Sequence, residues 1–300
     1  MLNTLDAAIF EAVINISEGR DVSRLTALRH AAGPALLDVH SDPDHNRSVF
    51  TVGADAMGLV LKSAQALTEA AVRTIDLADH DGVHPRFGVV DVVPFVALDG
   101  GLVAEAIDAA HEFGAWAGTT LDIPVFLYDM ATNPSPQTHR RSLPEVRRGA
   151  FVDIAPDCGP SQPNPRSGAI AVGARMPMVA INVLTDLPIE RAAEVAAQVR
   201  ESSGGLRGVR ALAFDTPELG GVQVSMNLIR LADTSTEAAC RAVSELVRLA
   251  GGRVLDFELV GLVPLADWQS WSDDFRRESS IGIVDTVERR WSAHHRNNPR

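Results

Sequence analysis

The sequence predicts an α+β protein made of two ferredoxin-like units, each with the element order β-α-β-β-α-β. Two observations support this fold class. Apolar residues recur with the spacing of strands in some segments and of helices in others, and the resulting element order occurs twice along the chain. A length of 300 residues also suits about two domains. We place the boundary between residues 1–176 and 177–300 and expect the two sheets to face each other across a ligand groove.

The second unit shows the pattern more clearly. A strand is expected near residues 178–185, followed by a helix over 187–202 that ends at two glycines. Two strands separated by a Pro/Gly turn and a final strand complete the sheet, and we expect them at 209–215, 222–228 and 253–261. The second helix is predicted to begin at Thr234, because Thr234 and Glu237 have the spacing of a capping box.

The first unit repeats this order with an extension. Its strands are predicted at 10–15, 35–40, 47–53 and 89–98, and its helices from Asp21 and over 56–75. A further helix (102–117) and strand (124–128) follow. Residues 155–175 are rich in Pro, Gly and Ser, and we interpret them as a functional loop, since loops of that length inside a compact chain tend to carry function.

Composition excludes several classes of protein. The net charge of −12, with 27 dispersed Lys and Arg residues, argues against nucleic-acid binding. A membrane span is not expected because the longest apolar runs fall short of about 20 residues. The N-terminus lacks the basic start of a secretory signal, so we expect a cytoplasmic protein. Its two cysteines, Cys158 and Cys240, are too few for a thiolate cluster and are expected to be reduced.

The residues that could carry chemistry lie in turns. Residues 79–88 hold two histidines, and Pro85 restricts the backbone beside His84, which suits an imidazole that moves protons. A solvated surface loop would also explain this composition. Residues 155–175 combine glycines with Arg166 and suit a planar, hydrogen-bonding ligand or a simple connector. The turn at 15–20 fits an N-cap formed by Ser17 or Asp21.

Residues 37–51 leave three interpretations open. His40, Asp42 and His45 are possible metal ligands, although their spacing matches no common site. The Asp-Pro and His-Asn pairs are also typical turn formers. Alternatively, Asn46 and Arg47 could contact an anionic substrate.

Several motifs occur in the order found in the glutamate formimidoyltransferase family, which the chain resembles from about residue 9 to about residue 270. These motifs are NISEGR, LDVHSDPDHNRSVFT, HPRFGVVDVVPF, RRSLPEVRRGAF, GPSQPNPRSGAIAVGAR, QVSMN and LVGLVPL. The resemblance implies two ferredoxin-like subdomains with tetrahydrofolate bound between them. It also implies transfer of a formimidoyl group between N-formimidoyl-L-glutamate and N5 of the folate in histidine degradation, by a homodimer. Because the chain ends at residue 300, we expect the cyclodeaminase domain of bifunctional relatives to be missing.

The resemblance also implies roles for individual residues. The family's catalytic histidine falls on His84. The predicted folate-binding loop consists of Gly159, Pro160, Ser161, Gln162, Pro163, Asn164, Pro165, Arg166, Ser167 and Gly168. From the chemistry of the turns themselves, we predict His40, Asn46, Arg47 and Arg86 as substrate-binding residues. Two positions depart from the family pattern: Ile16 replaces the usual Phe, and His40 stands where some relatives have an acidic residue.

The chemistry of the transfer agrees with this assignment. One imidazole with a pKa near ~6.5 can take a proton from the attacking nitrogen and return it to the departing one. We therefore expect small-molecule substrates and no metal. Two alternatives remain open at this point: a metal-dependent amidohydrolase of formimidoylglutamate that uses the histidines as ligands, and a non-catalytic folate-binding protein on the same scaffold.

Overall fold

The computed structural model describes residues 8–81, 86–98, 101–132 and 139–297. The chain divides into two compact units, Met1–Arg175 and Met176–Arg300. Each unit has its own sheet and its own apolar core. This confirms the predicted α+β class with two ferredoxin-like subdomains.

The first unit is built on a six-stranded sheet with the order β2-β3-β1-β4-β6-β5. The strands are β1 (Phe10–Ile16), β2 (Leu36–Asp42), β3 (Arg47–Ala54), β4 (Val90–Ala97), β5 (Val125–Asp129) and β6 (Ile170–Ala174). The first four pair antiparallel in the ferredoxin-like order, whereas β6 runs parallel to both β4 and β5.

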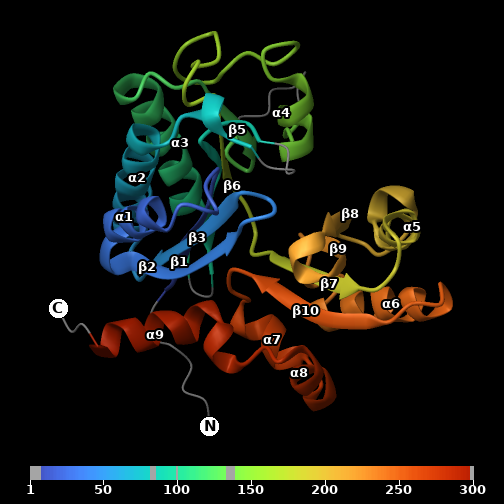
Figure 1. Cartoon of the computed structure of the whole chain (residues 1–300). Helices are drawn as coiled ribbons and strands as arrows, with labels where there is room; N and C mark the ends of the chain where they lie inside the picture. Colours follow the sequence, from blue (N-terminus) through green and yellow to red (C-terminus); the bar gives the residue numbers. More distant parts are fainter. Residues whose placement is uncertain (1–7, 82–85, 99–100, 133–138, 298–300) are drawn as a thin grey trace. The chain divides into compact units, whose positions relative to one another are not determined.

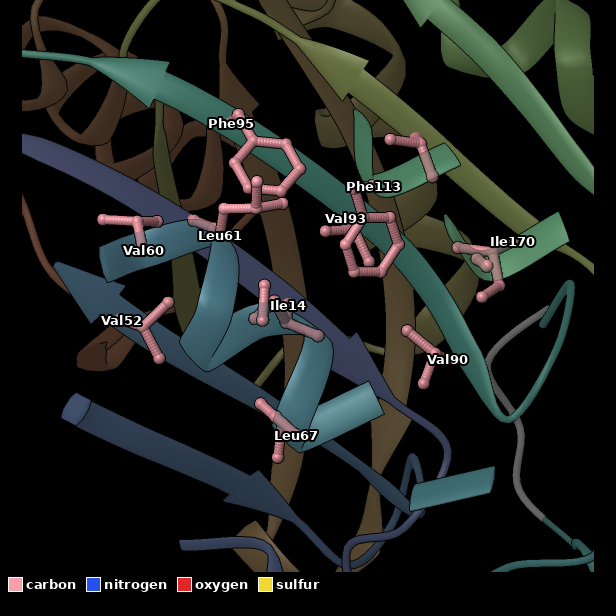
Figure 2. Close-up of a cluster of buried hydrophobic side chains, with 14 of the residues drawn as sticks. Ile14, Val52, Val60, Leu61, Leu67, Val90, Val93, Phe95, Phe113 and Ile170 are labelled. Carbon is pink, nitrogen blue, oxygen red and sulfur yellow. The ribbon is translucent and has the colours of Figure 1, made fainter. Parts of the chain in front are cut away.

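Helices cover both faces of this sheet. They are α1 (Val22–Ala32), α2 (Met57–Thr74), α3 (Val103–Thr120) and α4 (Leu143–Gly149). Side chains of α1, α2 and α3 pack into the main core on one face, and Figure 2 shows part of it, with Leu67 of α2 and Phe113 of α3 beside Ile14 of β1 and Phe95 of β4. Helix α4 lies on the other side of the sheet, beside β5 (Figure 1). Its Val146 packs there against side chains of β4, β5 and β6. Strands β5 and β6 are therefore covered on both faces, as is usual for parallel strands.

Strand β6 was missed by the sequence prediction, which placed residues 155–175 in one loop. The error has a physical cause. Residues Ile170–Ala174 are all buried, so the segment IAVGA lacks the alternation of buried and exposed residues that identifies a strand with one solvated face.

The second unit has the predicted β-α-β-β-α-β order and the strand order β10-β7-β9-β8. Its elements are β7 (Val179–Thr185), α5 (Ile189–Val199), β8 (Val209–Thr216), β9 (Gly221–Leu228), α6 (Thr236–Leu249) and β10 (Val254–Val260). Alternate residues of β7 and β9 are buried against α5 and α6. Cys240 of α6 is fully buried in this core. Three helices follow: α7 (Leu265–Ser270), α8 (Asp273–Ser279) and α9 (Val287–Asn297).

The predicted capping box of α6 was wrong. Ser235 is the N-cap, and its hydroxyl accepts a hydrogen bond from Ala238 N–H. The Thr234 hydroxyl instead donates to the carbonyl of Arg207, and the Glu237 carboxylate accepts two hydrogen bonds from Ser272 at the start of α8. Tertiary contacts therefore use both residues that the local spacing assigned to a cap.

None of the helices in the described ranges has the length and hydrophobicity that crossing a bilayer requires.

Candidate active site

Four turns of the first unit meet around one small pocket. One turn follows β1, one joins β2 to β3, one follows α2, and one leads into β4. The pocket has an empty volume of about 180 Å³, and we call it the arginine pocket. It is lined by Ser17, His45, Asn46, Arg47, His80, Arg86 and Asp91. A second pocket of about 230 Å³ shares Ser17, Asn46 and His80 with it and is bordered by acidic residues such as Asp76 and Asp79.

The turn between β2 and β3 is held by local hydrogen bonds. Asp42 accepts the backbone N–H of His45 at 2.9 Å, and its second carboxylate oxygen lies 3.4 Å from His45 Nδ1. Asn46 follows with φ +46°, a left-handed conformation that Asn adopts more readily than most residues. These contacts match the turn interpretation of Asp42 and His45. Within the described ranges, no three His, Cys, Asp or Glu side chains lie close enough together to hold a metal ion.

Asn46 connects three of the four turns. Its side-chain oxygen accepts the backbone N–H of Gly19 at 2.9 Å, and its side-chain nitrogen donates to the carbonyl of Asp81 at 2.8 Å. Its own carbonyl lies 2.8 Å from His80 Nε2. Both polar atoms of the Asn46 side chain are thus bonded to backbone, which describes a structural link. The predicted substrate contact through this side chain stays a prediction.

Arg47 places a half-buried positive charge beside the pocket. Its guanidinium donates to the side-chain oxygen of Asn15 in β1. Burial lowers the pKa of Arg47; the nearby charge of Asp91 raises it, and that of Arg147 lowers it further. The guanidinium nevertheless remains protonated, as arginine does throughout proteins.

Asp91 balances this charge from β4. Asp91 is only 2% exposed. One carboxylate oxygen accepts the backbone N–H of Phe87 at 2.7 Å, and the other pairs with Arg147 of α4 at 2.5 Å. Removal of one partner from such a buried pair lowers folding stability by about 3–5 kcal/mol. The contacts of Asp91 therefore hold α4 and the Phe87 segment in place beside the pocket.

Glu18 organises the turn after β1. One of its oxygens accepts the backbone N–H groups of Arg20 and Asp21, each at 2.9 Å, and the other pairs with Arg24 at 3.1 Å. Burial by itself raises the pKa of Glu18, but these donors lower it below its usual value. The N-cap of α1 is Asp21, which accepts the N–H groups of Ser23 and Arg24. Ser17 instead donates to the carbonyl of Gly88.

The predicted folate-binding loop ends against this site. Arg166 pairs with Asp76 at 3.0 Å, and its carbonyl accepts the N–H of Leu77 at 2.8 Å. Farther along, the Ser167 carbonyl accepts Val89 N–H, so the end of the loop is bonded to the segment that enters β4. Ser161, Gln162, Pro163 and Pro165 are exposed.

Two glycines of this loop pack against their own chain. Gly168 has φ +71°, and a Cβ there would lie 2.6 Å from the carbonyl oxygen of Phe87. Gly159 has φ +80°, and a Cβ there would lie 2.4 Å from the carbonyl oxygen of Ile123. The sequence analysis related the glycines of this loop to binding of a planar ligand. Close packing against the chain's own backbone already explains why residues 159 and 168 are glycine.

The structure brings together some of the predicted site residues. Asn46, Arg47 and Arg86 all line the arginine pocket. His40 lies in β2 opposite Val49 and does not line that pocket as the described residues define it. The predicted catalytic residue, His84, lies outside the described residues.

Sequence reasoning gave no role in the site to Asp91 or Arg147. Asp91 carried a signal, because an aspartate inside the apolar run VVDVVPF must find a partner when the strand is buried. Arg147 carried no such signal, because its pairing depends on where α4 packs. Ser17 was considered only as a possible cap.

Comparison with known proteins places the chain in a family. The model of the N-terminal subdomain of the formiminotransferase domain matches residues 9–175, and that of the formiminotransferase domain matches residues 179–289. A glutamate formimidoyltransferase of Streptococcus pyogenes is 35% identical, covering 86% of this chain and 90% of that protein. One from Thermoplasma acidophilum is 36% identical, with 86% and 88% covered. A formimidoyltransferase-cyclodeaminase of Dictyostelium discoideum is 32% identical over 92% of this chain and 54% of its own length. The chain belongs to the formiminotransferase family.

Proposed function

We propose that this protein is a glutamate formimidoyltransferase, a one-carbon transferase that moves the formimidoyl group between N-formimidoyl-L-glutamate and N5 of tetrahydrofolate. One observation carries the proposal. The family match extends through both units, and the two relatives named glutamate formimidoyltransferase are covered over about nine-tenths of their length.

The reaction requires proton movement. Attack by one amine nitrogen on the formimidoyl carbon forms a tetrahedral carbon that carries both nitrogens. A proton must then leave the attacking nitrogen and reach the departing nitrogen before the second C–N bond breaks. We assign this transfer to His84 as general base and then general acid, because an imidazole titrates near neutral pH.

The arginine pocket is suited to the anionic substrates. Formimidoylglutamate and folate both carry carboxylates, whereas the protein has a net charge of −12. Local positive charge must therefore attract the substrates, and Arg47 and Arg86 supply it at the pocket. Arg86 is anchored by a 2.9 Å hydrogen bond to the carbonyl of His80. We assign the glutamate carboxylates to these two guanidinium groups.

Tetrahydrofolate enters the proposal as a co-substrate. Residues Gly159 to Gly168 are the proposed folate contact, supported by the hydrogen bonds that join Arg166 and Ser167 to the segments beside the arginine pocket. The groove between the two sheets and the homodimer stay predictions.

The direct experiment incubates the purified protein with formimidoylglutamate and tetrahydrofolate and measures 5,10-methenyltetrahydrofolate after acid treatment. We expect product that increases with enzyme concentration. Absence of product, with tight folate binding retained, would support a non-catalytic folate-binding protein instead.

A further inference from the structure

His80 has one hydrogen-bonding nitrogen engaged and one buried. Its Nε2 lies 2.8 Å from the carbonyl oxygen of Asn46, and a carbonyl can only accept a hydrogen bond. The proton of the neutral ring is therefore assigned to Nε2. Nδ1 is buried and has no hydrogen-bond partner among the residues that the structure describes. The Nε2–H bond to Asn46 is the side-chain hydrogen bond that orients the ring.

His80 is connected to both arginines of the pocket. Its carbonyl accepts a hydrogen bond from the Arg86 guanidinium at 2.9 Å. Its ring holds the carbonyl of Asn46, the residue directly before Arg47. Arg47 and Arg86 lie about 40 residues apart in the chain, and both line the pocket. His80 contacts the side chain of Arg86 directly and reaches Arg47 through the backbone of Asn46.

The Asn46 turn makes this connection rigid. Asn46 is held through its side chain to Gly19 and Asp81 and through its carbonyl to His80. Its left-handed φ of +46° leaves Asn, Asp or Gly as the residues that fit without strain. A shift of His80 would therefore be transmitted to the start of β3, where Arg47 lies.

We propose that His80 is a positioning residue that sets the spacing of Arg47 and Arg86 and so determines affinity for a dicarboxylate amino-acid substrate. This inference rests on the proposed function, because the substrate it concerns is formimidoylglutamate. It assigns His80 a role through its Nε2–H group alone, with the proton transfers of the reaction left to another imidazole.

Two substitutions separate this role from a chemical one. His80→Leu removes the N–H donor, and the loss of one hydrogen bond to the turn should raise the KM for formimidoylglutamate about five- to tenfold. The KM for tetrahydrofolate should stay within about twofold of the wild type. His80→Gln places an amide N–H near the position of Nε2 and has no titratable ring, so it should recover most of the loss and leave the pH profile of kcat unchanged.

The outcomes are distinguishable. A His80→Leu enzyme with wild-type KM would overturn the proposal, and so would a His80→Gln enzyme as impaired as His80→Leu, which would show that the imidazole itself is needed. If His80→Leu does not fold, His80→Ala provides the second test. It also removes the Nε2–H donor to the Asn46 carbonyl, so the proposal requires a similar rise in KM. A wild-type KM in that folded variant would also overturn the proposal.

A measurement without activity separates this inference from the proposed function. The full chain is prepared with ¹⁵N-labelled histidine, and the His80 resonances are identified by their loss in His80→Gln. The proposal predicts a proton on Nε2 of the His80 ring in the wild type. A ring that carries no proton on Nε2 would overturn it whether or not the protein transfers formimidoyl groups. Conversely, an inactive wild type with the Nε2–H form would contradict the proposed function and leave the link to Asn46 established.

Discussion

At the scale of single residues, the central prediction concerns His84. Removal of a general acid–base group typically lowers turnover by about 10²- to 10⁴-fold. We expect His84→Ala to show a loss of that size in kcat, with folding and tetrahydrofolate affinity retained, because the side chain acts on the proton and not on the pteridine. Steady-state kinetics and folate titration measure the two effects. A variant with near wild-type turnover would remove His84 from the mechanism.

Asp267 predicts a pH dependence of stability in the second unit. The residue is 7% exposed, and its carboxylate accepts a hydrogen bond from Trp271 Nε1 at 3.0 Å. Burial raises the pKa of Asp267, and the bonds from Thr236 and Trp271 oppose this only in part. The folded state thus holds the proton to higher pH than the unfolded state. The resulting stability is fully present below the ordinary pKa of 3.8 and is lost as the pH rises through the raised value.

Asp267→Asn provides the measurement, since Asn is neutral at every pH. The free energy of unfolding of the wild type, relative to that of the variant, should fall as the pH rises from about 4 to about 7. Urea unfolding at several pH values checks this. A difference that stays constant across the series would show that Asp267 ionises normally in the folded protein.

Residue types in turns were predictable, whereas long-range pairs were not. His, Asn and Arg in short polar turns stand out in the sequence, and Asn46, Arg47 and Arg86 do meet in one pocket. The Asp91–Arg147 pair joins residues 56 positions apart. Its existence depends on the packing of α4 against β5, which no local pattern reports. The side-chain bonds of Asn46 were also unforeseen, because they end on backbone atoms of distant turns.

At the scale of elements, the short helix α4 depends on its N-terminus. The Glu145 carboxylate accepts hydrogen bonds from the hydroxyl and the N–H of Ser142, at 2.6 and 2.7 Å, and lies 2.8 Å from His139 Nε2. The Ser142 hydroxyl, the Ser142 N–H and His139 together lower the pKa of Glu145 to about 2. This helix carries Arg147 to Asp91, so its N-terminus bears on the arginine pocket.

We expect Ser142→Ala to destabilise α4 by about 1 kcal/mol, the usual effect of losing an N-cap side chain. Amide exchange of residues 143–149 should become faster, and the pKa of Glu145 should move up from about 2 toward 4.5. Hydrogen exchange and an NMR titration follow the two changes. Unchanged exchange rates would mean that packing alone holds the helix.

Gly168 joins the end of the predicted folate loop to the Phe87 segment. Any Cβ at this position meets both a left-handed φ of +71° and the Phe87 carbonyl at 2.6 Å. Gly220 is a matched control, because its φ is +72° and nothing lies within 4 Å of its Cβ position. Gly220→Ala should cost about 1–2 kcal/mol from the backbone conformation alone. Gly168→Ala should lower the thermal midpoint clearly more, and equal shifts in the two variants would show that the loop yields without strain.

The antiparallel strands could be predicted from the periodicity of apolar residues, whereas β6 of the first sheet could not. Strands such as β7 and β9 alternate between a helix-covered face and the opposite face, which produces a period of two. The five residues of β6 are buried on both faces and sit in a Gly/Pro-rich context. The start of α6 was misassigned because Glu237 bonds to Ser272, 35 residues away.

At the scale of the whole molecule, the proposed function requires a local reversal of charge. The chain carries −12 overall, yet Arg47 and Arg86 line the pocket and Arg147 lies close behind it. Asp91 is already neutralised by Arg147 and the Phe87 N–H. We therefore expect the site to attract carboxylates although the protein as a whole is negatively charged.

The most direct test of the account is whether glutamate release depends on tetrahydrofolate. Purified protein is incubated with formimidoylglutamate, with and without tetrahydrofolate, and both glutamate and the folate product are measured. A transferase must form one folate product for each glutamate released, so we predict equal amounts with tetrahydrofolate and no glutamate without it. Glutamate release in the absence of tetrahydrofolate, abolished by a chelator, would contradict the account and identify a metal-dependent hydrolase.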